Sequence, residues 1–586
     1  MEARFDDLTP GGSSFRLRDP VGVLEATRPD EVAGAIEAAE AAAARGLSVA
    51  GFVTYEAGPA LDPSLAAPPQ RSEGAVSTLP LAWFGMFERR EETALPEPRD
   101  AAPGASAWRP SIARERYDAS IAAIREYIAA GDTYQVNFTM RLRSTLAGDP
   151  RGLYRDLCFA QRGAHAGYVD TGRHRILSAS PELFFRLDGR SITTRPMKGT
   201  APRGRWPEED AALAAMLVAS DKDRAENAMI VDLIRNDLGR VAVPGSVGWD
   251  RVFEAERYET VWQLTSTVTA QLASGIGLAD VFRALFPSGS VTGAPKVRSM
   301  QIIAGLEDSP RGVYCGAVGW LAPQGTDGPD ASFNVAIRTV VVDAGTGLAE
   351  YGVGGGITWD SSAAGEYDET VAKARVLTSR RPSFELVETL LHDPEDGYRR
   401  LDEHLERLRS SADYFGFVFD EHAVRGALTE AAASSLKRPL RVRLTLARSG
   451  SIAWGALPMP ASTNDHVRVA LDDVPVDPTD VMLFHKTSLR TRYEEARARH
   501  PDADDVLLIN TRGEMTESTI ANLAVRIDGR WWTPPLDCGL LAGTERTALL
   551  AEGVLAERVI TRDDVRAAGE IALVNSARPW RTATLL

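Results

Sequence analysis

A break in the sequence pattern near residue 380 constrains most strongly what this chain can fold into. Residues 378–383, TSRRPS, are polar and contain a proline, which is typical of a junction. After them FELVETLL begins a new strand, and RRLDEHLERLRSSADYFG has the hydrophobic period of an amphipathic helix. The chain has 586 residues, whereas single hydrophobic cores stop growing at about 250–300 residues. The sequence therefore predicts two units, residues 1–377 and 384–586, joined by a linker at residues 378–383.

The first of these units is itself divided by an exposed connection. Residues 94–110, ALPEPRDAAPGASAWRP, are rich in proline and alanine. They separate an N-terminal subregion, residues 1–105, from a larger core, residues 110–377. Helix-like and strand-like segments are mixed on both sides of this connection, which predicts an α/β fold of the α+β type.

The charge and the cysteine content exclude several classes of protein. The formal net charge is −15, whereas binding to nucleic acid or to anionic membranes requires basic surface. Cys158, Cys315 and Cys538 are far apart, which argues against a zinc site or a disulfide framework. The first residues lack an apolar signal sequence, and nowhere do about 18 apolar residues follow one another. We therefore expect a cytoplasmic protein with no nucleic-acid or membrane partner, while small anionic substrates stay compatible.

Two predicted helices carry acidic pairs with the same spacing. In KDRAENAMIVDLIRNDLGR (222–240) the pair is Asp223 and Glu226, and in GEYDETVAKA (365–374) it is Glu366 and Glu369. Residues at i and i+3 lie on one face of a helix, and such pairs are commonly just solvated surface. If the two helices faced each other, however, the carboxylates would repel without a cation, and oxygen ligands of this kind suit Mg²⁺. The expected core residues of the first helix are Ala225, Ala228, Met229 and Leu233.

Two glycine-containing segments bear on anion binding. The segment EYGVGGGITWDSS (350–362) does not fit the G-x-G-x-x-G dinucleotide fingerprint. Its clustered glycines would instead let backbone N–H groups approach an anion closely. In GSVTGAPK (289–296) the spacing of a phosphate-binding loop is absent, because Ala-Pro separates Gly293 from Lys296. The sequence therefore does not predict nucleotide binding.

Seven motifs follow one another in order along the first unit. They are SASPELFF, PMKGTAPRG, KDRAENAMIVDLIRNDLGR, FPSGSVTGAPKVRSMQII, YCGAVGW, FNVAIRT and GVGGGI followed by EYDET. This series resembles the chorismate-utilising enzymes, which include anthranilate, isochorismate and aminodeoxychorismate synthases. The resemblance implies a large chorismate-binding domain, a two-sheet, sandwich-like structure with surrounding helices.

The resemblance also implies roles for individual residues. Glu226 and Glu369 would hold Mg²⁺ with support from Asp223 and Glu366, and Glu182 would be the general acid that helps the C4 hydroxyl of chorismate to leave. Arg338 suits a substrate carboxylate, because a guanidinium can pair with one in a bidentate manner. The implied substrate-binding residues are Tyr314, Arg338, Gly354, Gly355 and Gly356.

A single lysine, Lys198, lies between a proline and a Gly-Thr pair in RPMKGTAPRG (195–204). It can be interpreted as a charged loop residue or as a nucleophile held by a rigid turn. Anthranilate synthases have alanine at this position, whereas aminodeoxychorismate synthases have lysine in a similar motif. By resemblance Lys198 would add to C2 of chorismate as the C4 hydroxyl departs, and ammonia would then attack C4 and expel the lysine. A lysine can do this only when neutral, which requires a desolvated site. Isochorismate synthases use a lysine to activate water, so the lysine alone does not identify the acceptor.

Two features of these enzymes are altered or missing. Where relatives have histidine in a stretch resembling HLxS, this chain has Gln263, which puts elimination of pyruvate by the first unit in doubt. A Gly-x-Cys-x-Gly nucleophile motif does not occur. The nitrogen must therefore come from ammonia directly or from a separate glutamine amidotransferase subunit.

The second unit isolates another lysine, Lys486, in FHKTSLRTRYEEA (484–496). Hydroxyl-bearing turns follow in LLAGTERTALL (540–550) and ALVNSARP (572–579), where they suit a phosphate, although plain capping explains them equally well. With LDEHLERLRSSADYFGF and GEMTESTIANL, these segments resemble the fold-type IV pyridoxal-phosphate enzymes. The resemblance implies that Lys486 forms a Schiff base with pyridoxal 5′-phosphate, and it allows a homodimer formed through this unit. The other implied cofactor-binding residues are Glu517 at the pyridinium nitrogen and Arg407, Thr544 and Ser576 at the phosphate.

The two resemblances together predict a bifunctional enzyme. The first unit would convert chorismate and ammonia to aminodeoxychorismate, and the second would release pyruvate from it to give 4-aminobenzoate for folate-type metabolism. Lys486 would act as general base and acid in the second reaction. Two alternatives stay open. One is an anthranilate-type or isochorismate-type unit fused to an aminotransferase, and the other is a non-catalytic scaffold that binds a glutaminase.

Overall fold

The computed structural model describes residues 1–9, 11–68, 76, 79–94, 96, 105–326, 328–378, 383–434, 438–459 and 466–586. Residues 379–382 of the predicted linker lie outside these described residues. The chain forms two units, one of residues 1–203 and 214–382 and the other of residues 204–213 and 383–586. The predicted mixed α/β class is confirmed. The domain boundaries expected from the sequence stay predictions.

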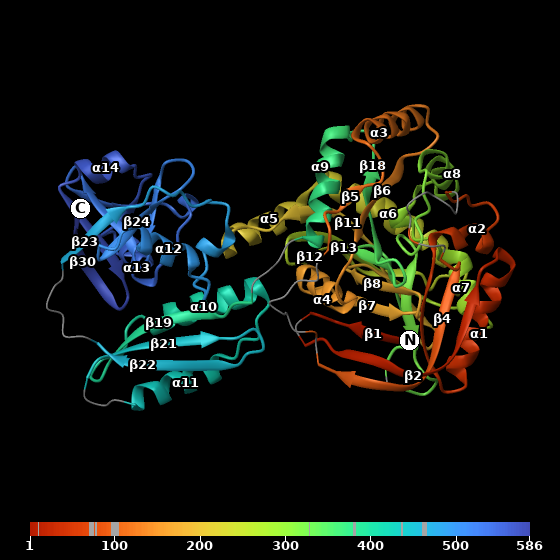
Figure 1. Ribbon diagram of the computed structural model, residues 1–586, viewed down its shortest axis with the longest axis horizontal. Helices are drawn as coiled ribbons and strands as arrows, with labels where there is room; N and C mark the ends of the chain where they lie inside the picture. The colour runs from red at the N-terminus through yellow and green to blue at the C-terminus, as the bar shows by residue number, and fades with distance from the viewer. Residues whose placement is uncertain are drawn as a thin grey trace. The chain divides into compact units, whose positions relative to one another are not determined.

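The described strands of the first unit form one continuous antiparallel sheet (Figure 1). In chain order they are β1 (Glu2–Asp6), β2 (Ser14–Ala26), β3 (Ser48–Val53), β4 (Ala82–Thr93), β5 (Arg109–Pro110), β6 (Gln135–Thr145), β7 (His165–Asp170), β8 (His174–Ser180), β9 (Leu183–Asp188), β10 (Ser191–Arg195), β11 (Met197–Pro202), β12 (Gly248–Arg257), β13 (Val261–Gln271), β14 (Gly293–Ala294), β15 (Ala317–Leu321), β16 (Ala331–Val335), β17 (Thr339–Asp343) and β18 (Leu348–Ile357). Hydrogen-bonded neighbours run from β12 and β13 through β10, β9, β16, β15 and β3 to β4. From β4 they continue through β2, β1, β7, β8, β17 and β18 to β6.

This sheet folds back on itself around an aromatic core. Phe52, Trp83 and Val318 come from β3, β4 and β15, yet they are buried in one cluster with Val169 and Ile176 from β7 and β8. Because these two groups of strands belong to different parts of the sheet, their faces pack against each other as in a sandwich. The sandwich-like arrangement is therefore present, and hydrogen bonds join all its strands into one sheet.

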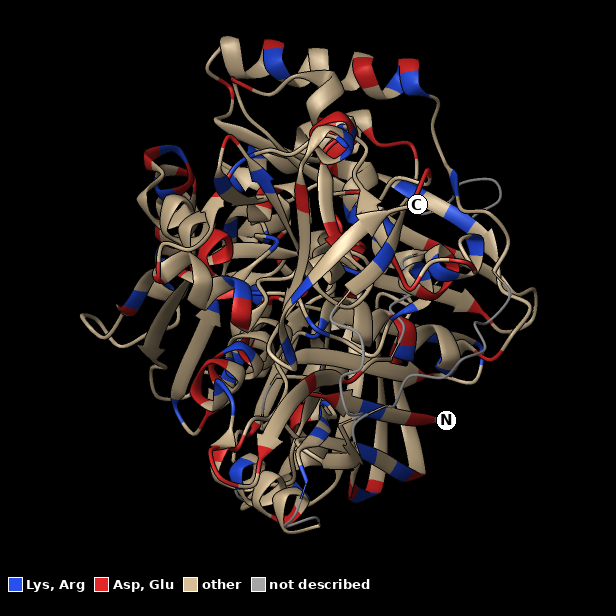
Figure 2. Ribbon diagram, turned by 90° about the vertical axis from the view of Figure 1, so that its left-hand side faces the viewer, with Lys and Arg blue, Asp and Glu red and all other residues tan. Residues whose placement is uncertain are grey.

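Helices cover the outer faces of the folded sheet and contribute to two further cores. The helices of the first core are α1 (Val32–Ala44), α2 (Gly58–Leu61), α6 (Asp221–Gly239) and α7 (Leu278–Leu285). The helices of the second core are α3 (Arg114–Ala129), α4 (Pro150–Gln161), α8 (Lys296–Leu306) and α9 (Ala363–Ala374). None of the helices in the described residues is long and apolar enough to cross a membrane. Acidic and basic residues are interspersed along helices and strands (Figure 2).

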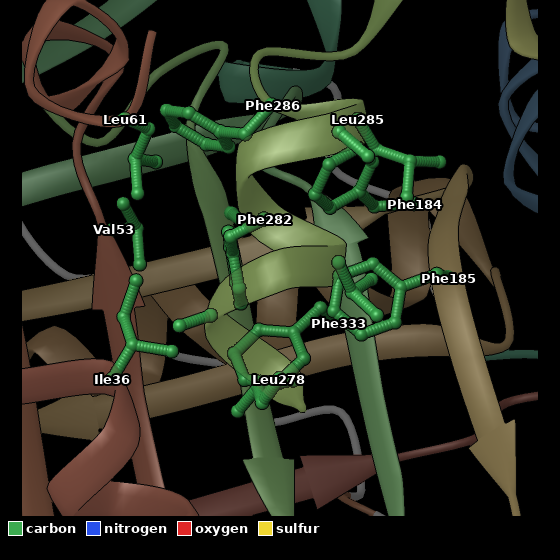
Figure 3. Close-up of a cluster of buried hydrophobic side chains, with 14 of the residues drawn as sticks. Ile36, Val53, Leu61, Phe184, Phe185, Leu278, Phe282, Leu285, Phe286 and Phe333 are labelled. Atoms are coloured by element: carbon green, nitrogen blue, oxygen red, sulfur yellow. The ribbon is translucent and has the colours of Figure 1, made fainter. Parts of the chain in front are cut away.

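Helix α7 illustrates how the sequence pattern produces these cores. Its apolar residues Leu278, Phe282 and Leu285 recur at helical spacing and therefore share one face. The ring of Phe282 lies 5.4 Å from that of Phe185 on β9 and 5.3 Å from that of Phe333 on β16. Figure 3 shows this face of the helix directed at these aromatic side chains. One amphipathic helix thus closes the core over two neighbouring strands.

Helix α6 lies at Asp221–Gly239, as predicted, but its core face was predicted wrongly. Ala225 and Ala228 are exposed, and Met229 and Leu233 are half-buried. The helix packs on β11 and β13, and the residues directed at those strands, not the alanines, form the core. They are Asn227, Ile230, Val231, Ile234 and Leu238.

The second unit contains two sheets. The four-stranded sheet consists of β19 (Leu386–Asp393), β20 (Gly397–Tyr398), β21 (Leu440–Leu446) and β22 (Ile452–Pro458). The eight-stranded sheet consists of β23 (His466–Leu471), β24 (Asp505–Ile509), β25 (Met515–Ser518), β26 (Asn522–Ile527), β27 (Arg530–Thr533), β28 (Ala556–Glu557), β29 (Glu570–Asn575) and β30 (Arg578–Leu585). Because β25 pairs with both β24 and β26, the strands β23, β24, β25, β26, β29 and β30 close into a ring.

The helices of the second unit pack beside these sheets. They are α10 (Leu401–Phe415), α11 (Glu421–Ala433), α12 (Thr491–Arg499), α13 (Thr544–Ala551) and α14 (Arg562–Ala567). Helix α10 was predicted from its periodicity, and its apolar face is buried. Residues 204–213, in which α5 (Pro207–Ala219) begins, also belong to this unit. The hydroxyl of Tyr414 donates a hydrogen bond to the carbonyl of Gly204 at 2.6 Å, a long-range pairing that the sequence did not predict.

Candidate active sites

The predicted site residues of the first unit line one cavity of about 520 Å³. Strands β11 and β18, helices α6 and α9 and the loops between elements contribute them. They are Glu182, Lys198, Asp223, Glu226, Tyr314, Arg338, Gly354, Gly355, Gly356, Glu366 and Glu369. The structure therefore brings all these side chains and glycines together, while their individual roles remain predictions.

Lys198 lies on β11, where the strand loses its regular register with β13 between Met197 and Thr200. The next residue, Gly199, has a φ of 101°, which L side chains rarely adopt, so the Lys-Gly order permits this turn. The Lys198 ammonium lies 3.4 Å from a carboxylate oxygen of Glu226, and the lysine side chain is only 19% exposed. Lys198 is therefore directed at the cavity, which argues against a loop residue extended into solvent.

Asn227, the neighbour of Glu226 on α6, fixes the main chain of Lys198. Its Nδ2 donates to the carbonyl oxygens of Lys198 at 3.2 Å and of Leu264 at 3.0 Å. Its Oδ1 accepts a hydrogen bond from the hydroxyl of Ser266 at 2.6 Å. This buried side chain thus ties α6 to β11 and β13. The sequence interpretation missed Asn227, although a polar residue on the buried face of a helix is a signal that could have identified it.

The first turn of α6 orients its acidic pair. The Ser220 hydroxyl accepts a hydrogen bond from the Asp223 backbone N–H as the N-cap, and donates to Asp223 Oδ2 at 2.5 Å. A Cβ on Gly199 would lie 3.0 Å from the Cβ of Asp223, so the turn after Lys198 approaches this carboxylate closely. One turn further along, Glu226 reaches the ammonium of Lys198. The i,i+3 spacing therefore places both carboxylates on the helix face that borders the cavity.

Helix α9 supplies the second acidic pair. Ser361 Oγ donates to Glu366 at 2.6 Å, and burial raises the pKa of Glu366. Lys373 Nζ lies 2.6 Å from Glu369 Oε1 and donates to the carbonyl of Gly354 at 3.0 Å. Burial opposes ionisation of Glu369, but the Lys373 ammonium outweighs it and lowers the pKa of that carboxyl. Lys373 thus connects α9 to the glycine-rich strand β18.

The donor set of this cavity fits Mg²⁺. Two carboxylate pairs from two helices line the same space, and oxygen atoms are the ligands that Mg²⁺ prefers. In the part of the chain that the structure describes, no three His, Cys, Asp or Glu side chains are arranged to hold a metal ion by themselves. Mg²⁺ usually keeps several waters and takes only one or two protein carboxylates, with substrate oxygens completing the set. Glu226 on α6 and Glu369 on α9 are the residues that would hold it.

The same cavity also offers groups that suit an anion. Arg338 has a φ of 52°, uncommon for a non-glycine residue, and its guanidinium donates to the carbonyl of Lys373 at 2.7 Å. Tyr314 is buried against β18, where a Cβ on Gly352 would lie 2.1 Å from its ring. On the same strand a Cβ on Gly356 would lie 2.8 Å from Lys198 Nζ. Glycines are therefore required for the tyrosine and the lysine to approach this strand so closely.

Glu182 is a buried carboxyl at the edge of the cavity. Burial raises its pKa to about 7, although a hydrogen bond from Ser290 opposes this effect. A carboxyl with such a pKa is protonated in part at neutral pH, as a general acid must be. The property matches the role that the resemblance implies.

Gln263 also lines the cavity, and its Oε1 accepts a hydrogen bond from the hydroxyl of Thr200 at 3.2 Å. A glutamine amide can position a partner but does not titrate. Next to this part of the cavity, the structure adds Gln135, which the sequence interpretation missed. Its Nε2 would lie 2.1 Å from a Cβ on Gly356, so its buried amide packs directly against β18.

A buried cluster of three charged side chains lies beside the ring of Tyr314. Glu307 pairs with Arg311 at 2.7 Å and with Arg141 at 3.1 Å, and all three side chains are at most 2% exposed. The guanidinium of Arg141 lies 5.4 Å from the centre of the Tyr314 ring, within range of a cation–π contact. The sequence interpretation missed this cluster, because Arg141 and Glu307 come from distant parts of the chain.

In the second unit, the predicted cofactor-binding residues line one pocket together. They are Arg407, Lys486, Glu517, Thr544 and Ser576. The segment that carries Lys486 pairs with the start of β19, because the Val387 N–H donates to the Lys486 carbonyl at 2.9 Å. Burial, with the positive charge of Arg407, lowers the pKa of Lys486 to about 8. About one tenth of this amine is therefore neutral at pH 7 and able to react with an aldehyde, far more than for an ordinary lysine.

Glu517 on β25 is the carboxylate of this pocket. Burial raises its pKa to about 7, although the Tyr493 hydroxyl, which donates at 2.9 Å, opposes this effect. Asn522 Nδ2 and the Leu541 N–H both donate to its Oε2 at 3.3 Å. A cation beside Glu517 would favour the carboxylate form, and a protonated pyridine nitrogen is such a cation. The residues present therefore fit the ring of pyridoxal phosphate.

Two buried residues that the sequence interpretation missed, Glu388 and His404, contact the predicted phosphate-binding residues of this pocket. Glu388 accepts two hydrogen bonds from the Arg407 guanidinium, at 2.9 and 2.6 Å, and lies 2.6 Å from Nδ1 of His404. His404 Nε2 lies 2.8 Å from Ser576 Oγ and 3.4 Å from Thr544 Oγ1. Glu388 and His404 thus form a buried network that contacts all three predicted phosphate-binding residues, Arg407, Ser576 and Thr544. The i,i+3 spacing of His404 and Arg407 places both on one face of α10, and this spacing is the sequence signal that could have indicated the network.

Comparison with protein families gives one match for each of two ranges of the chain. Residues 14–379 match the model of the chorismate binding enzyme family, which covers more than half of the chain. The chain belongs to the chorismate binding enzymes. Residues 385–586 match a second model, that of amino-transferase class IV. The first match ends at residue 379 and the second begins at residue 385.

Curated relatives of this chorismate binding enzyme carry two different names. Aminodeoxychorismate synthase component 1 of Klebsiella aerogenes is 45% identical over 268 residues, which cover 46% of this chain and 58% of that protein. The Escherichia coli protein of the same name is 43% identical over the same shares of the two chains. Anthranilate synthase component 1 of Streptomyces coelicolor is 42% identical over 275 residues, or 47% of this chain and 53% of that protein. The chain thus matches less than two thirds of the length of these relatives, at nearly equal identity.

Solved structures support the fold of the first unit. Anthranilate synthase component I from Streptococcus pneumoniae superposes with a TM-score of 0.55 and 26% identity, covering 63% of this chain and 92% of that one. The isochorismate synthase MenF from Escherichia coli gives a TM-score of 0.51 at 17% identity, covering 65% and 89%. Both likenesses concern the fold of the chorismate-binding part.

Proposed function

We propose that this chorismate binding enzyme makes 4-aminobenzoate in two steps. The first unit would replace the C4 hydroxyl of chorismate by ammonia to give aminodeoxychorismate and water. The second unit would split aminodeoxychorismate into 4-aminobenzoate and pyruvate. The observation that carries the proposal is the position of Lys198, which faces the cavity between the carboxylate pairs and the glycine strand.

In the first unit, cationic and hydroxyl groups would bind the substrate's carboxylates. Arg338 and Tyr314 would do so together with backbone N–H groups of β18, which the glycines leave accessible. When bound, Mg²⁺ would supply positive charge for a carboxylate of the substrate. Glu182 would hold a proton and transfer it to the departing C4 oxygen.

Lys198 would act as the nucleophile at C2 of the same substrate. Its Nζ would form a bond there while the C4 hydroxyl leaves, and ammonia would then attack C4 and release the lysine. The hydrogen bond from Asn227 to the Lys198 carbonyl would hold the amine on the cavity side of β11. Gln263, which does not titrate, suits a first unit that stops at amination and leaves release of pyruvate to the second.

In the second unit, Lys486 would move the proton. Its Nζ, with a pKa of about 8, can accept a proton from the substrate and return it, as general base and then general acid. Pyridoxal phosphate, when bound, would supply the electron sink for this reaction. Glu517 would hold the pyridine end of the cofactor, and Arg407, Thr544 and Ser576 its phosphate.

The proposal also includes a nitrogen source, a cellular location and an oligomeric state. Ammonia would enter free or from a separate glutamine amidotransferase subunit, which the names of the component 1 relatives suggest. A cytoplasmic location is proposed, because Cys158, Cys315 and Cys538 are buried free thiols, as a reducing compartment keeps them. Pairing of two chains through the second unit is part of the same proposal.

Product analysis tests the proposal directly. The purified chain should convert chorismate, in the presence of Mg²⁺, ammonium and pyridoxal phosphate, to 4-aminobenzoate and pyruvate in equal amounts. Formation of anthranilate instead would assign the other reaction of this family to the chain. Formation of neither product, with both cofactors bound, would favour a non-catalytic scaffold.

A further inference from the structure

The support beneath the predicted phosphate site forms a continuous hydrogen-bonded chain. It runs from Arg407 through Glu388 to His404 and ends at the hydroxyls of Ser576 and Thr544. Glu388 is 3% exposed and His404 is 1% exposed. Elements distant in sequence supply these groups, namely β19, α10, the start of α13 and the turn after β29. The arrangement is thus a built network and not a local capping motif.

When the imidazole of His404 is neutral, this hydrogen-bonded chain has one proton too few to donate to a phosphate as well. The Arg407 guanidinium holds the pKa of Glu388 far below its usual value against the effect of burial, so Glu388 is a carboxylate and Nδ1 of His404 carries the hydrogen between them. In a neutral imidazole the other nitrogen, Nε2, is then an acceptor only. The Ser576 hydroxyl, 2.8 Å from Nε2, is a much closer donor than the Thr544 hydroxyl at 3.4 Å, so it directs its single proton to Nε2. It has no proton left for a phosphate dianion, which can only accept.

We propose that His404 is a positioning residue that takes up a proton at Nε2 when a phosphate ester enters this pocket. The new Nε2–H then donates to Ser576 Oγ, and the serine turns its own hydroxyl proton toward a phosphate oxygen. The proton comes from solvent, no covalent bond changes, and the pocket gains one positive charge together with the phosphate's negative ones. This inference rests on the proposed pyridoxal-phosphate site of the second unit and adds the protonation state of its support.

The charges around His404 allow this uptake only when an anion is present. Without the phosphate, burial and the positive charges of Arg407 and Lys486 oppose a charged imidazole, and Glu388 alone favours it. Arg407 already neutralises Glu388 through its two hydrogen bonds. A phosphate dianion next to Ser576 adds the missing negative charge, which shifts the balance toward the imidazolium. Binding of phosphate and binding of the proton are therefore coupled.

The experiment counts protons and compares two aldehydes. Calorimetry of pyridoxal phosphate binding to the whole protein, in buffers of different ionisation enthalpy at neutral pH, gives the protons taken up. The wild type should take up about one proton more than the His404→Gln variant, because a single imidazole site titrates. In that variant a neutral amide replaces the imidazole, so the affinity for pyridoxal phosphate should fall about tenfold to a hundredfold, the value of a hydrogen bond to a charged group. Affinity for pyridoxal, which lacks the phosphate, should change less than about twofold, because no such bond is lost.

A matched control and a second measurement keep the test decisive. His422→Gln, an exposed histidine at the start of α11, should leave the proton count unchanged. If His404→Gln does not fold, ¹⁵N spectra of the wild type, which has eight histidines, still decide, because His404 should show both ring nitrogens protonated only with pyridoxal phosphate. Binding that depends on Lys486 but gives equal proton counts in wild type and variant would overturn the role of His404 alone. No binding of pyridoxal phosphate to the wild type would overturn the cofactor site as well.

Discussion

Replacing Gly356 by alanine tests whether the glycine strand positions Lys198. Gly356 lies on β18 and has no positive φ, so alanine fits its backbone conformation. The added Cβ would lie 2.8 Å from Lys198 Nζ and 2.1 Å from Gln135 Nε2. Non-bonded heavy atoms prefer separations of about 3.5 Å. The effect of the substitution must therefore come from moving these two side chains, not from backbone strain.

The structure allows the size of the effect to be estimated. To restore a separation of ~3.5 Å, the lysine amine must retreat by about 0.7 Å and the glutamine amide by about 1.4 Å. A misplacement of ~1 Å in a reacting group costs about a hundredfold in rate. We therefore expect Gly356→Ala to lower kcat/KM for amination by about tenfold to a hundredfold, or ~1.4–2.7 kcal/mol of activation free energy. Overpacking should also lower the free energy of unfolding by about 1–3 kcal/mol.

The assay compares the two activities of one protein. The amination rate is measured with chorismate, Mg²⁺ and ammonium, and the second activity is measured separately with added aminodeoxychorismate. Gly248→Ala on β12 is the matched control, since its Cβ would come no closer than 4.0 Å to Thr269 Oγ1. It should leave both activities and the melting temperature near those of the wild type.

Two results would refute the reasoning. Amination by Gly356→Ala within about threefold of the wild type would mean that Lys198 tolerates displacement, so the close contact would carry no catalytic meaning. Equal loss of both activities, in proportion to loss of folded protein, would mean that the glycine matters only for packing. Loss of amination alone, in a folded protein, is the expected outcome.

The remaining predictions concern the two lysines and Asn227. Lys486→Ala should accumulate aminodeoxychorismate, detected by chromatography, because its first unit is intact; a normal yield of 4-aminobenzoate would show that Lys486 is not the cofactor lysine. Lys198→Ala should lose amination and keep the second activity, and mixing the two variants should restore 4-aminobenzoate if the intermediate diffuses through solvent. Asn227→Ala removes the donor shared by two carbonyls, so kcat for amination should fall more than KM rises. The free energy of unfolding should fall by about 1–3 kcal/mol. An unchanged kcat would mean that Asn227 serves packing alone. The rate at which the cofactor-free protein takes up pyridoxal phosphate should rise with pH and level off above a pKa of about 8, because only the neutral amine of Lys486 reacts; a flat stopped-flow profile would contradict this assignment.

Sequence patterns predicted the features that depend on neighbouring residues. The i,i+3 spacing of Asp223 and Glu226 predicted that both carboxylates share one helix face, because helical geometry alone fixes this, and both line the same cavity. The period of residues 399–416 correctly indicated helix α10. The core face of α6 was wrong, since the choice of face depends on which strands the helix meets, and no local pattern records that.

The supports of the site could not be predicted, because they join residues that are far apart in the chain. Glu307 reaches Arg141 across 166 residues, and His404 reaches Ser576 across 172. Each partner, taken alone, is an ordinary charged or polar residue, and only the fold shows that it is buried and paired. The assignment of residues 204–213 to the second unit has the same cause, because the Tyr414 hydroxyl meets Gly204 over 210 residues.

Overall similarity cannot decide which product the first unit makes. Relatives named for aminodeoxychorismate and for anthranilate synthesis are 45% and 42% identical to this chain, a difference too small to separate two reactions. The two reactions differ in where the nitrogen attaches, so the residue that matters is one that can bond to the ring. An alanine in place of Lys198 has no such atom, and the cavity residues proposed to bind carboxylates would serve either reaction equally. We therefore propose that Lys198, which lies beside Glu226 and whose carbonyl accepts from the Asn227 amide, is the position that decides the identity of the product.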